Sequence, residues 1–322
     1  ASSVIDIRLK EGNMRNFNME GSLGLISSKL LVEGPIIEDK LSFAVSGRRT
    51  YLDILASPFI AAFGNGAKAG YFFHDYNAKL QYKINERHRL FLSGYFGKDK
   101  VYVEDRYTGS PQLGNGGFED VFAVNMQWGN EIGALRWNYQ ISPKLFKNTT
   151  VTYSNYKFET GVRDEYYEVK SAFNKELIES YAFGMFSGVQ DWGIRSDFNY
   201  RPNNKHTIRF GAYETYHTFR PGQNYINVNN AEEKIDSISG SSSLYSHELG
   251  AYIEDEFKIT NRFSVNAGFH FALLHVNRTN YFAPQPRINA KFDLNEKSYL
   301  RAGASRMTQF LHLLSNSGIG LP

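Results

Sequence analysis

Five charged or imidazole side chains, Arg48, Arg136, Arg195, Asp197 and His270, are the positions of this sequence that we single out as candidates for contact with a solute. Arg48 belongs to the basic pair Arg48-Arg49, and one member of such a pair on a strand must face inward. A guanidinium there can form a salt bridge or contact an anionic solute. The other four fall on the polar faces of alternating segments. We expect all five to face an aqueous interior, where most interior charges meet water or protein rather than substrate.

Covalent and metal chemistry have little support in the sequence. The chain has no cysteine, which excludes thiolate ligands, disulfides and cysteine nucleophiles. His270 and His275 are five residues apart and would diverge on a strand, and no G-x-S-x-G nucleophile elbow occurs. We therefore expect no catalytic site, no metal and no cofactor. A net charge of +3 without a lysine or arginine run also argues against a nucleic-acid partner.

The elements that carry these residues show a period of two. Apolar and polar residues alternate in four segments, which are 76–84, 134–141, 263–271 and 287–294. This alternation predicts β-strands with one apolar and one polar face. We expect the apolar set to point outward, namely Leu135, Trp137, Tyr139, Phe263, Val265, Ala267, Ile288, Ala290 and Phe292. The polar set should point inward, namely Arg136, Asn138, Asn266, His270, Asn289 and Lys291.

Connections between the alternating segments vary in length. Short polar turns lie near residues 33–40, 85–88, 142–144, 201–205, 260–262 and 295–297. Longer connections are expected at 54–73, 102–119, 160–180, 220–244 and 277–284. Strictly alternating short and long connections are typical of an up-and-down barrel in the outer membrane. We predict about twelve strands in six hairpins after residue 14.

Composition supports a membrane barrel over a soluble sandwich. Aromatic residues make up 15% of the chain, yet the mean hydropathy is −0.43. No run of 18 apolar residues could span as a helix, so a membrane form must be a closed sheet. The spans 122–141, 181–200 and 246–259 exceed the roughly 9–11 residues that cross lipid. We therefore predict an all-β, transmembrane, antiparallel barrel that is tall, located in the outer membrane of a Gram-negative cell.

Several segments resemble TonB-dependent outer-membrane transporters, in the SusC-like form common in Bacteroidetes. The segment 3–12 is similar to the end of their plug domain, and 43–53 and 71–80 are similar to their first barrel strands. Segment 308–316 resembles one of their external loops. The resemblance implies that residues 1–12 end the plug or form a linker. Residues 13–322 would then be a partial barrel, supplying about twelve of roughly 22 strands around a plug of roughly 120–150 residues.

The resemblance also implies a function and partners. Such a transporter imports a solute too large for porins, driven by the TonB complex acting through the plug, within the lipid bilayer and without covalent chemistry. The apolar residues 60–63 would form a patch on an external loop where a SusD-like surface lipoprotein could dock. Two alternatives stay open, a structural or assembly barrel and a passive porin.

The two outermost strands bear on these alternatives. We expect the strands near 17–32 and 297–304 to lie far apart, each with an unpaired edge that lipid does not tolerate. More chain is therefore expected at both ends. A cylinder closed by pairing of these two strands would instead favour a small porin.

Overall fold

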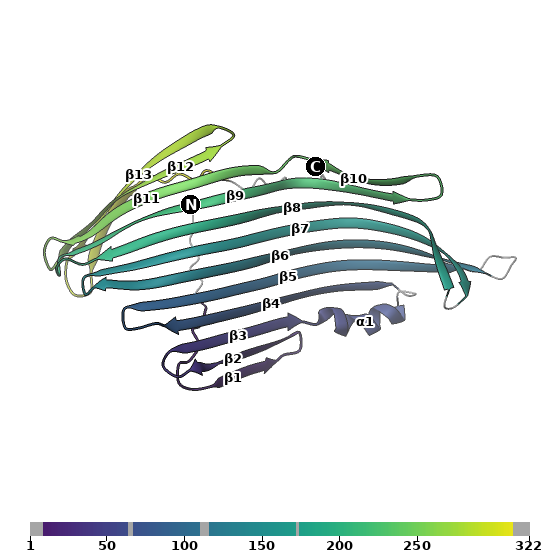
Figure 1. Ribbon diagram of the computed structural model, residues 1–322, viewed down its shortest axis with the longest axis horizontal. Helices are drawn as coiled ribbons and strands as arrows, with labels where there is room; N and C mark the ends of the chain where they lie inside the picture. Colours follow the sequence, from purple (N-terminus) through teal and green to yellow (C-terminus); the bar gives the residue numbers. More distant parts are fainter. Residues whose placement is uncertain (1–8, 64–66, 110–115, 172–173, 312–322) are drawn as a thin grey trace.

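The computed structural model describes residues 9–63, 67–109, 116–171 and 174–311. Over these residues the chain is one antiparallel sheet of 14 strands with a single helix (Figure 1). The elements are β1 Asn18–Leu23, β2 Ser27–Ile37, β3 Leu41–Thr50, α1 Leu52–Phe63, β4 Lys68–Lys83, β5 His88–Gly109, β6 Gly117–Ser142, β7 Leu145–Ser171, β8 Asn174–Tyr200, β9 His206–Asn229, β10 Lys234–Gly240, β11 Leu244–Lys258, β12 Phe263–Val276, β13 Thr279–Asp293 and β14 Tyr299–Ser305. The predicted all-β antiparallel fold is confirmed.

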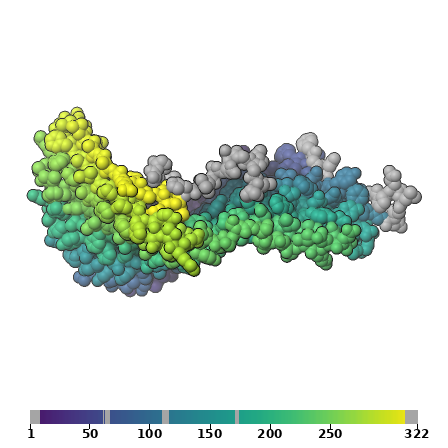
Figure 2. Space-filling view, turned by 90° about the horizontal axis from the view of Figure 1, so that it is seen from above, coloured from purple at the N-terminus to yellow at the C-terminus, as the bar shows by residue number. Residues whose placement is uncertain are grey.

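The order of strands in the sheet follows the order in the sequence. The path runs from β1 to β14, and only β10 leaves it, pairing with β9 alone. In the described part of the chain, β1 pairs with β2 and β14 pairs with β13, so the sheet is open there, as expected. Figure 2 shows that the sheet curls at the end that carries β11 to β14, which leaves one face hollowed.

Short turns at one end of the sheet share an asparagine device. The Oδ1 of Asn85 accepts hydrogen bonds from the backbone amides of Arg87 and His88, at 2.9 and 3.0 Å. Asn203 and Asn295 make the same pair of bonds to the amides two and three residues later. Because an asparagine side chain can mimic a backbone turn, these residues reverse the chain within a few positions.

Three predicted long connections are instead continuations of strands. β5 to β8 are 22, 26, 27 and 27 residues long and run through most of 102–119 and 160–180, while β9 and β10 occupy much of 220–244. A strand above the membrane does not need an apolar outer face, so charged residues there are compatible with a strand and do not indicate a loop. The sheet has 14 strands rather than about twelve, because the predicted strand near 17–32 is divided into β1 and β2 and because β10 is added.

Two further connections differ from expectation. The turn between β12 and β13 is tight, because Asn277 and Arg278 have φ of 48° and 63°, the left-handed pair that two-residue hairpins require. The predicted long connection at 277–284 was therefore wrong. Residues 52–63 form α1, a helix with Pro58 inside it, rather than an irregular loop. Across the described residues, no helix is long and apolar enough to cross a membrane.

Strand register separates the side chains into two faces. Leu92, Leu135, Val151 and Ile194 stand in one row across β5 to β8, and 39–52% of each is exposed. The neighbouring row on the opposite face contains Phe91, Arg136, Thr150, Arg195 and Tyr213. We call the face with Arg136 the inner face and the face with Leu135 the outer face. An exposed apolar outer face and a polar inner face are the arrangement of a membrane barrel wall.

Candidate functional site

The segment from Leu9 to Gly12 lies against the inner face and is fixed there by polar contacts. Lys79 Nζ donates to the carbonyl of Leu9 at 3.2 Å and lies 3.3 Å from the carboxylate of Glu11. Arg136 Nη2 lies 3.4 Å from the same carboxylate, so Glu11 bridges β4 and β6. We call Glu11, Lys79 and Arg136 the latch.

Residues beside the latch hold the same segment to the first strands. Lys10 Nζ lies 3.0 Å from the carboxylate of Glu33, a residue with only 2% of its surface exposed. The Oγ of Ser42 donates to the carbonyl of Gly12 at 2.9 Å. A Cβ at Gly12 would collide with the backbone carbonyl of Phe43, so this close approach requires glycine.

A cavity of about 910 Å³ lies between this segment and the wall. Leu9 and Glu11 line it on one side, and strands β4 to β9 line it on the other. The wall residues are Lys79, Phe91, Ser93, Ala134, Arg136, Asn148, Thr150, Thr152, Gly193, Ile194, Arg195, Asp197, Tyr213, Glu214 and Thr215. Most of the lining residues carry a hydroxyl, amide or charged group, so they can form hydrogen bonds with a hydrated solute.

Arg195 and Asp197 form one compact group on the cavity wall. Arg195 Nε donates to both carboxylate oxygens of Asp197, at 2.8 and 2.9 Å. The hydroxyl of Tyr252 donates to Asp197 at 2.6 Å. The guanidinium of Arg195 lies 5.8 Å from the ring centroid of Tyr213 and 5.6 Å from that of Tyr252. Two aromatic rings and a carboxylate thus hold one cation in place.

His270 joins this group through a tyrosine. Its Nε2 lies 3.2 Å from the hydroxyl of Tyr213, within hydrogen-bonding distance. The structure therefore brings together three of the five sequence candidates, Arg195, Asp197 and His270. Arg136 lines the same cavity but belongs to the latch, where its guanidinium also lies 4.3 Å from the ring centroid of Phe91.

Arg48 is separate from the other candidates. Its Nη2 lies 2.7 Å from the carboxylate of Asp75, and its guanidinium lies 4.7 Å from the ring centroid of Phe73. These contacts connect β3 to β4, and Arg48 does not line the cavity. Its neighbour Arg49 pairs with Asp53 of α1 at 3.0 Å.

Sequence reasoning missed the two tyrosines and the latch. Tyr213 and Tyr252 stand in polar rows of β9 and β11, and only the register of β8, β9 and β11 brings them to Arg195 and Asp197. Glu11 gave no signal at all, because its partners are 68 and 125 residues away in sequence. In the part of the chain that the structure describes, no group of three or more His, Asp or Glu side chains is arranged to hold a metal ion.

No family model and no curated protein sequence matches the chain. Among solved structures, it is similar to the pyoverdine outer-membrane receptor FpvA of Pseudomonas aeruginosa. One FpvA structure has a TM-score of 0.55 at 12% identity, over 91% of this chain and 42% of that chain. A second has a TM-score of 0.53 at 13% identity, over 92% of this chain and 46% of that chain. This chain therefore spans less than half the length of those receptors.

A channel of another kind also matches. The monoaromatic hydrocarbon channel CymD has a TM-score of 0.34 at 8% identity, over 89% of this chain and 80% of that chain. The similarity to FpvA shows that this chain has the fold of an outer-membrane β-barrel wall. That fold and the exposed apolar outer face locate the chain in the outer membrane of a Gram-negative cell.

Proposed function

We propose that this chain is part of a TonB-dependent active transporter that imports a solute too large for porins. Residues 9–12 form the link between a plug and the barrel that begins after them. The wall cavity with Arg195 and Asp197 belongs to the path of the solute, which binds reversibly and undergoes no covalent chemistry. The TonB complex acts through the plug.

The observation that carries this proposal is the latch. A polypeptide segment bound to the inner face by Lys79, Arg136 and Ser42 occupies space that a passive pore leaves to water. An ion pair in a partly hydrated interior contributes little, about 0–1 kcal/mol for an exposed pair, so it can be released and remade. Reversible attachment is what a plug that moves during transport needs.

The expected transport partners follow from the same proposal. The SusC-like form of the family pairs with a surface lipoprotein, and we extend that expectation to this chain. The proposed docking patch at 60–63 lies in α1, where the side chains of Ala61 and Phe63 are outside the described residues. Ile60 and Ala62, whose side chains the structure describes, are the residues of this patch at which substitution can test the contact with the lipoprotein.

Two measurements on the natural protein that contains this chain test the proposal. In planar bilayers, we expect no steady conductance from the wild type, because the interior is occupied. In cells, uptake of its solute should stop when a protonophore collapses the inner-membrane gradient or when TonB is deleted. Steady conductance together with gradient-independent uptake would instead establish a passive porin.

A further inference from the structure

The long ends of β5 to β9 have an apolar inner face. Val103, Val124, Val162, Phe183 and Ile226 stand in one row across the five strands. Between 37% and 50% of each of these residues is exposed. The pairings from β5 to β8 have no register shift between this row and the row of Arg136, so both rows are on the same face.

Adjacent rows widen this apolar face. Phe122 and Tyr181 stand in the next row away from the membrane along the strands, with 46% and 43% of their surfaces exposed. Met126 stands in the next row toward the membrane, with 37% exposed. Five strands about 4.8 Å apart make a face about 20 Å across. We call these eight residues, 103, 122, 124, 126, 162, 181, 183 and 226, the apolar vestibule.

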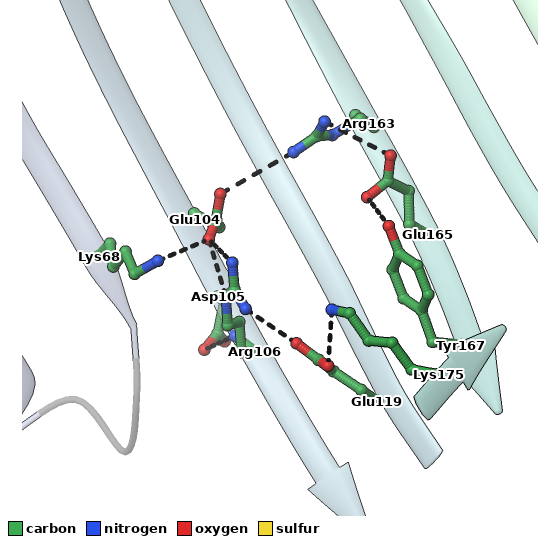
Figure 3. A network of polar contacts seen from close by, with 9 residues as sticks. All are labelled: Lys68, Glu104, Asp105, Arg106, Glu119, Arg163, Glu165, Tyr167 and Lys175. Carbon is green, nitrogen blue, oxygen red and sulfur yellow. Dashed lines mark hydrogen bonds and ion pairs between the residues drawn. The ribbon is translucent and has the colours of Figure 1, made fainter. Parts of the chain in front are cut away.

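The opposite face of the same strands is charged and closed. A lattice of ion pairs runs over it from β4 to β8 (Figure 3). Arg106 contacts Glu104 at 2.7 Å and Glu119 at 2.9 Å, and Lys175 contacts Glu119 at 3.1 Å. Under this lattice, Val121 and Ala123 are only 3% and 9% exposed. The sheet therefore covers the apolar residues of its outer face and leaves those of its inner face open.

The charges on the two faces also differ, because the outer lattice combines cations with carboxylates, whereas the described rows of the apolar vestibule carry carboxylates alone. Register places Asp105, Asp120, Asp164 and Glu179 among the residues of the apolar vestibule. Burial, and then the neighbouring carboxylate of Asp120, raise the pKa of Asp164. Within the described residues 101–107, 118–126, 158–166 and 179–185, the inner-face rows contain no lysine or arginine. The cations that Figure 3 draws, Lys68, Arg106, Arg163 and Lys175, belong to the outer lattice, whereas Lys170 at the end of β7 pairs with Glu176.

We propose that the apolar vestibule binds a short peptide with both apolar and cationic side chains, which is the solute that the transporter imports. The apolar rows would cover the apolar side chains of the peptide, and the four carboxylates would pair with its cations. A peptide of about six residues in extended form is about 20 Å long, which matches the width of the face. This inference rests on the proposed transport function.

Binding to the purified natural protein in detergent tests the inference directly. The probe is a fluorescent hexapeptide of alternating Phe and Lys, compared by anisotropy with a Phe–Glu hexapeptide and a Ser–Lys hexapeptide. We expect the Phe–Lys peptide to bind at least about tenfold more tightly than either of the other two. Equal binding of the Phe–Lys and Phe–Glu peptides would overturn the inference, because the face would then be a general apolar interface.

Matched variants locate the bound peptide. Asp164→Asn should weaken binding about two- to fivefold, the range of an exposed ion pair. Glu165→Gln makes the same change on the opposite face one residue later, and it should leave binding unchanged. Phe183→Ser should weaken binding about tenfold or more, as for an aromatic anchor, while the adjacent Ala182→Ser should not. Equal effects within either pair would overturn the assignment to the inner face.

Failure of this inference and failure of the proposed function are distinguishable. If the peptide does not bind but uptake of another solute depends on the proton gradient, the vestibule inference is wrong and active transport stands. If the peptide binds as expected but enters cells without the gradient, the vestibule inference stands and active transport is wrong.

Discussion

The long strands β5 to β9 have two parts, a membrane part near the short turns and a projecting part beyond it. The apolar side chains of these two parts lie on opposite faces of the sheet. Near the short turns, β8 places Ile194 on the outer face and Arg195 on the inner face. Further along, β8 places Phe183 on the inner face, while Arg163 of the adjoining β7 lies on the outer face. Because side chains alternate between the two faces without interruption from Ile194 to Phe183, the change of polarity comes from the residue types and not from a shift in the strand. The outer face meets lipid in the membrane part, where it carries apolar side chains. It meets water in the projecting part, where it carries charged side chains.

The geometry of the wall explains where the reversal falls. Glu104 is 16 residues beyond His88, the first residue of β5. At about 3.3 Å per residue and a tilt of about 45°, this places Glu104 about 35 Å above the short turns. An apolar band of a barrel is about 25 Å tall, so the ion lattice lies above the membrane.

The largest expected effect comes from a charge on the outer face of the membrane part. Ile194→Arg should destabilise the protein by about 2–4 kcal/mol, because Ile194 lies near the middle of the apolar band. The measurement is a denaturant titration of the protein refolded into lipid vesicles. Phe183→Arg, on the same strand in the projecting part, is the control and should cost less than about 1 kcal/mol. Similar costs for the two variants would contradict the reversal of polarity.

A smaller effect is expected from the ion lattice. Arg106→Gln removes the shared partner of Glu104 and Glu119 and should destabilise the ends of β5 and β6 by about 1 kcal/mol. Faster amide exchange at 103–107 and 118–122, with unchanged exchange in the membrane part, would report it. Lys100→Gln is the matched control, since Lys100 contacts the ring of Tyr102 rather than a carboxylate. Protection that is unchanged in Arg106→Gln would show that the lattice does not stabilise these ends.

Opposite responses to pH should separate the two faces of the projecting part. Burial acts to raise the pKa of Glu104, but the hydrogen bond and charge of Arg106 and the charge of Lys68 hold it below its ordinary value. Its contribution to stability is present above about pH 4.3 and is lost as pH falls through the lowered pKa. The pKa of Asp164 is raised, so its protonation should stabilise the fold as pH falls through that raised value.

Amide exchange, corrected for its intrinsic pH dependence, measures both responses. Asp164→Asn should increase protection of the ends of β7 and β8 at pH 7 and remove the gain that acidification gives the wild type. Glu104→Gln should remove the loss of protection at lower pH. If both variants change the pH profile in the same direction, the two carboxyl groups do not have opposite environments.

The smallest effect is expected at the latch, which belongs to the membrane part alone. Glu11→Gln should weaken the attachment of residues 9–12 by about 0.5–1 kcal/mol, because Lys79 and Arg136 lose a shared carboxylate. Amide exchange of residues 9–14 should become faster, and exchange in the projecting part should not change. Glu38→Gln, in the turn between β2 and β3, is the control. Unchanged exchange of residues 9–14 in Glu11→Gln would show that other contacts hold the segment.

Local alternation is sufficient to predict the fold and the strands in the membrane. The same alternation is present in the projecting parts of the strands. Leu135, Trp137 and Tyr139 alternate with polar residues and stand on the outer face, as expected. Phe122, Val124 and Met126 alternate as regularly within the predicted span 122–141, whereas the charged residues just before it, such as Glu119, fall in the long connection predicted at 102–119. Alternation of apolar and polar residues is present there as well, but its apolar residues lie on the opposite face. A pattern in which the apolar face changes sides beyond about eleven residues therefore predicts the continuation of these strands.

The candidate site depends on register, which local patterns do not supply. Alternation places Arg195 and Asp197 on one face, yet it gives no reason to bring Tyr252 of β11 to Asp197. The latch is even harder to predict from local patterns, because Glu11 contacts β4 and β6 only after both strands have joined the sheet. Contacts between distant segments require pairing information that a single sequence does not contain.

The sequential order of the strands has a consequence for folding. Each strand from β2 to β9 pairs with the strand just before it, and apart from the connection between β3 and β4, which contains α1, the loops between them are only a few residues long. The entropic cost of closing such loops is small, so successive hairpins can add one at a time to a growing edge. At every stage the newest strand exposes a free backbone edge, which is a template for the next strand and also for aggregation. Because β1 pairs with β2 alone in the described part of the chain, assembly of this wall requires protection of the edge of β1 as well as of the newest edge.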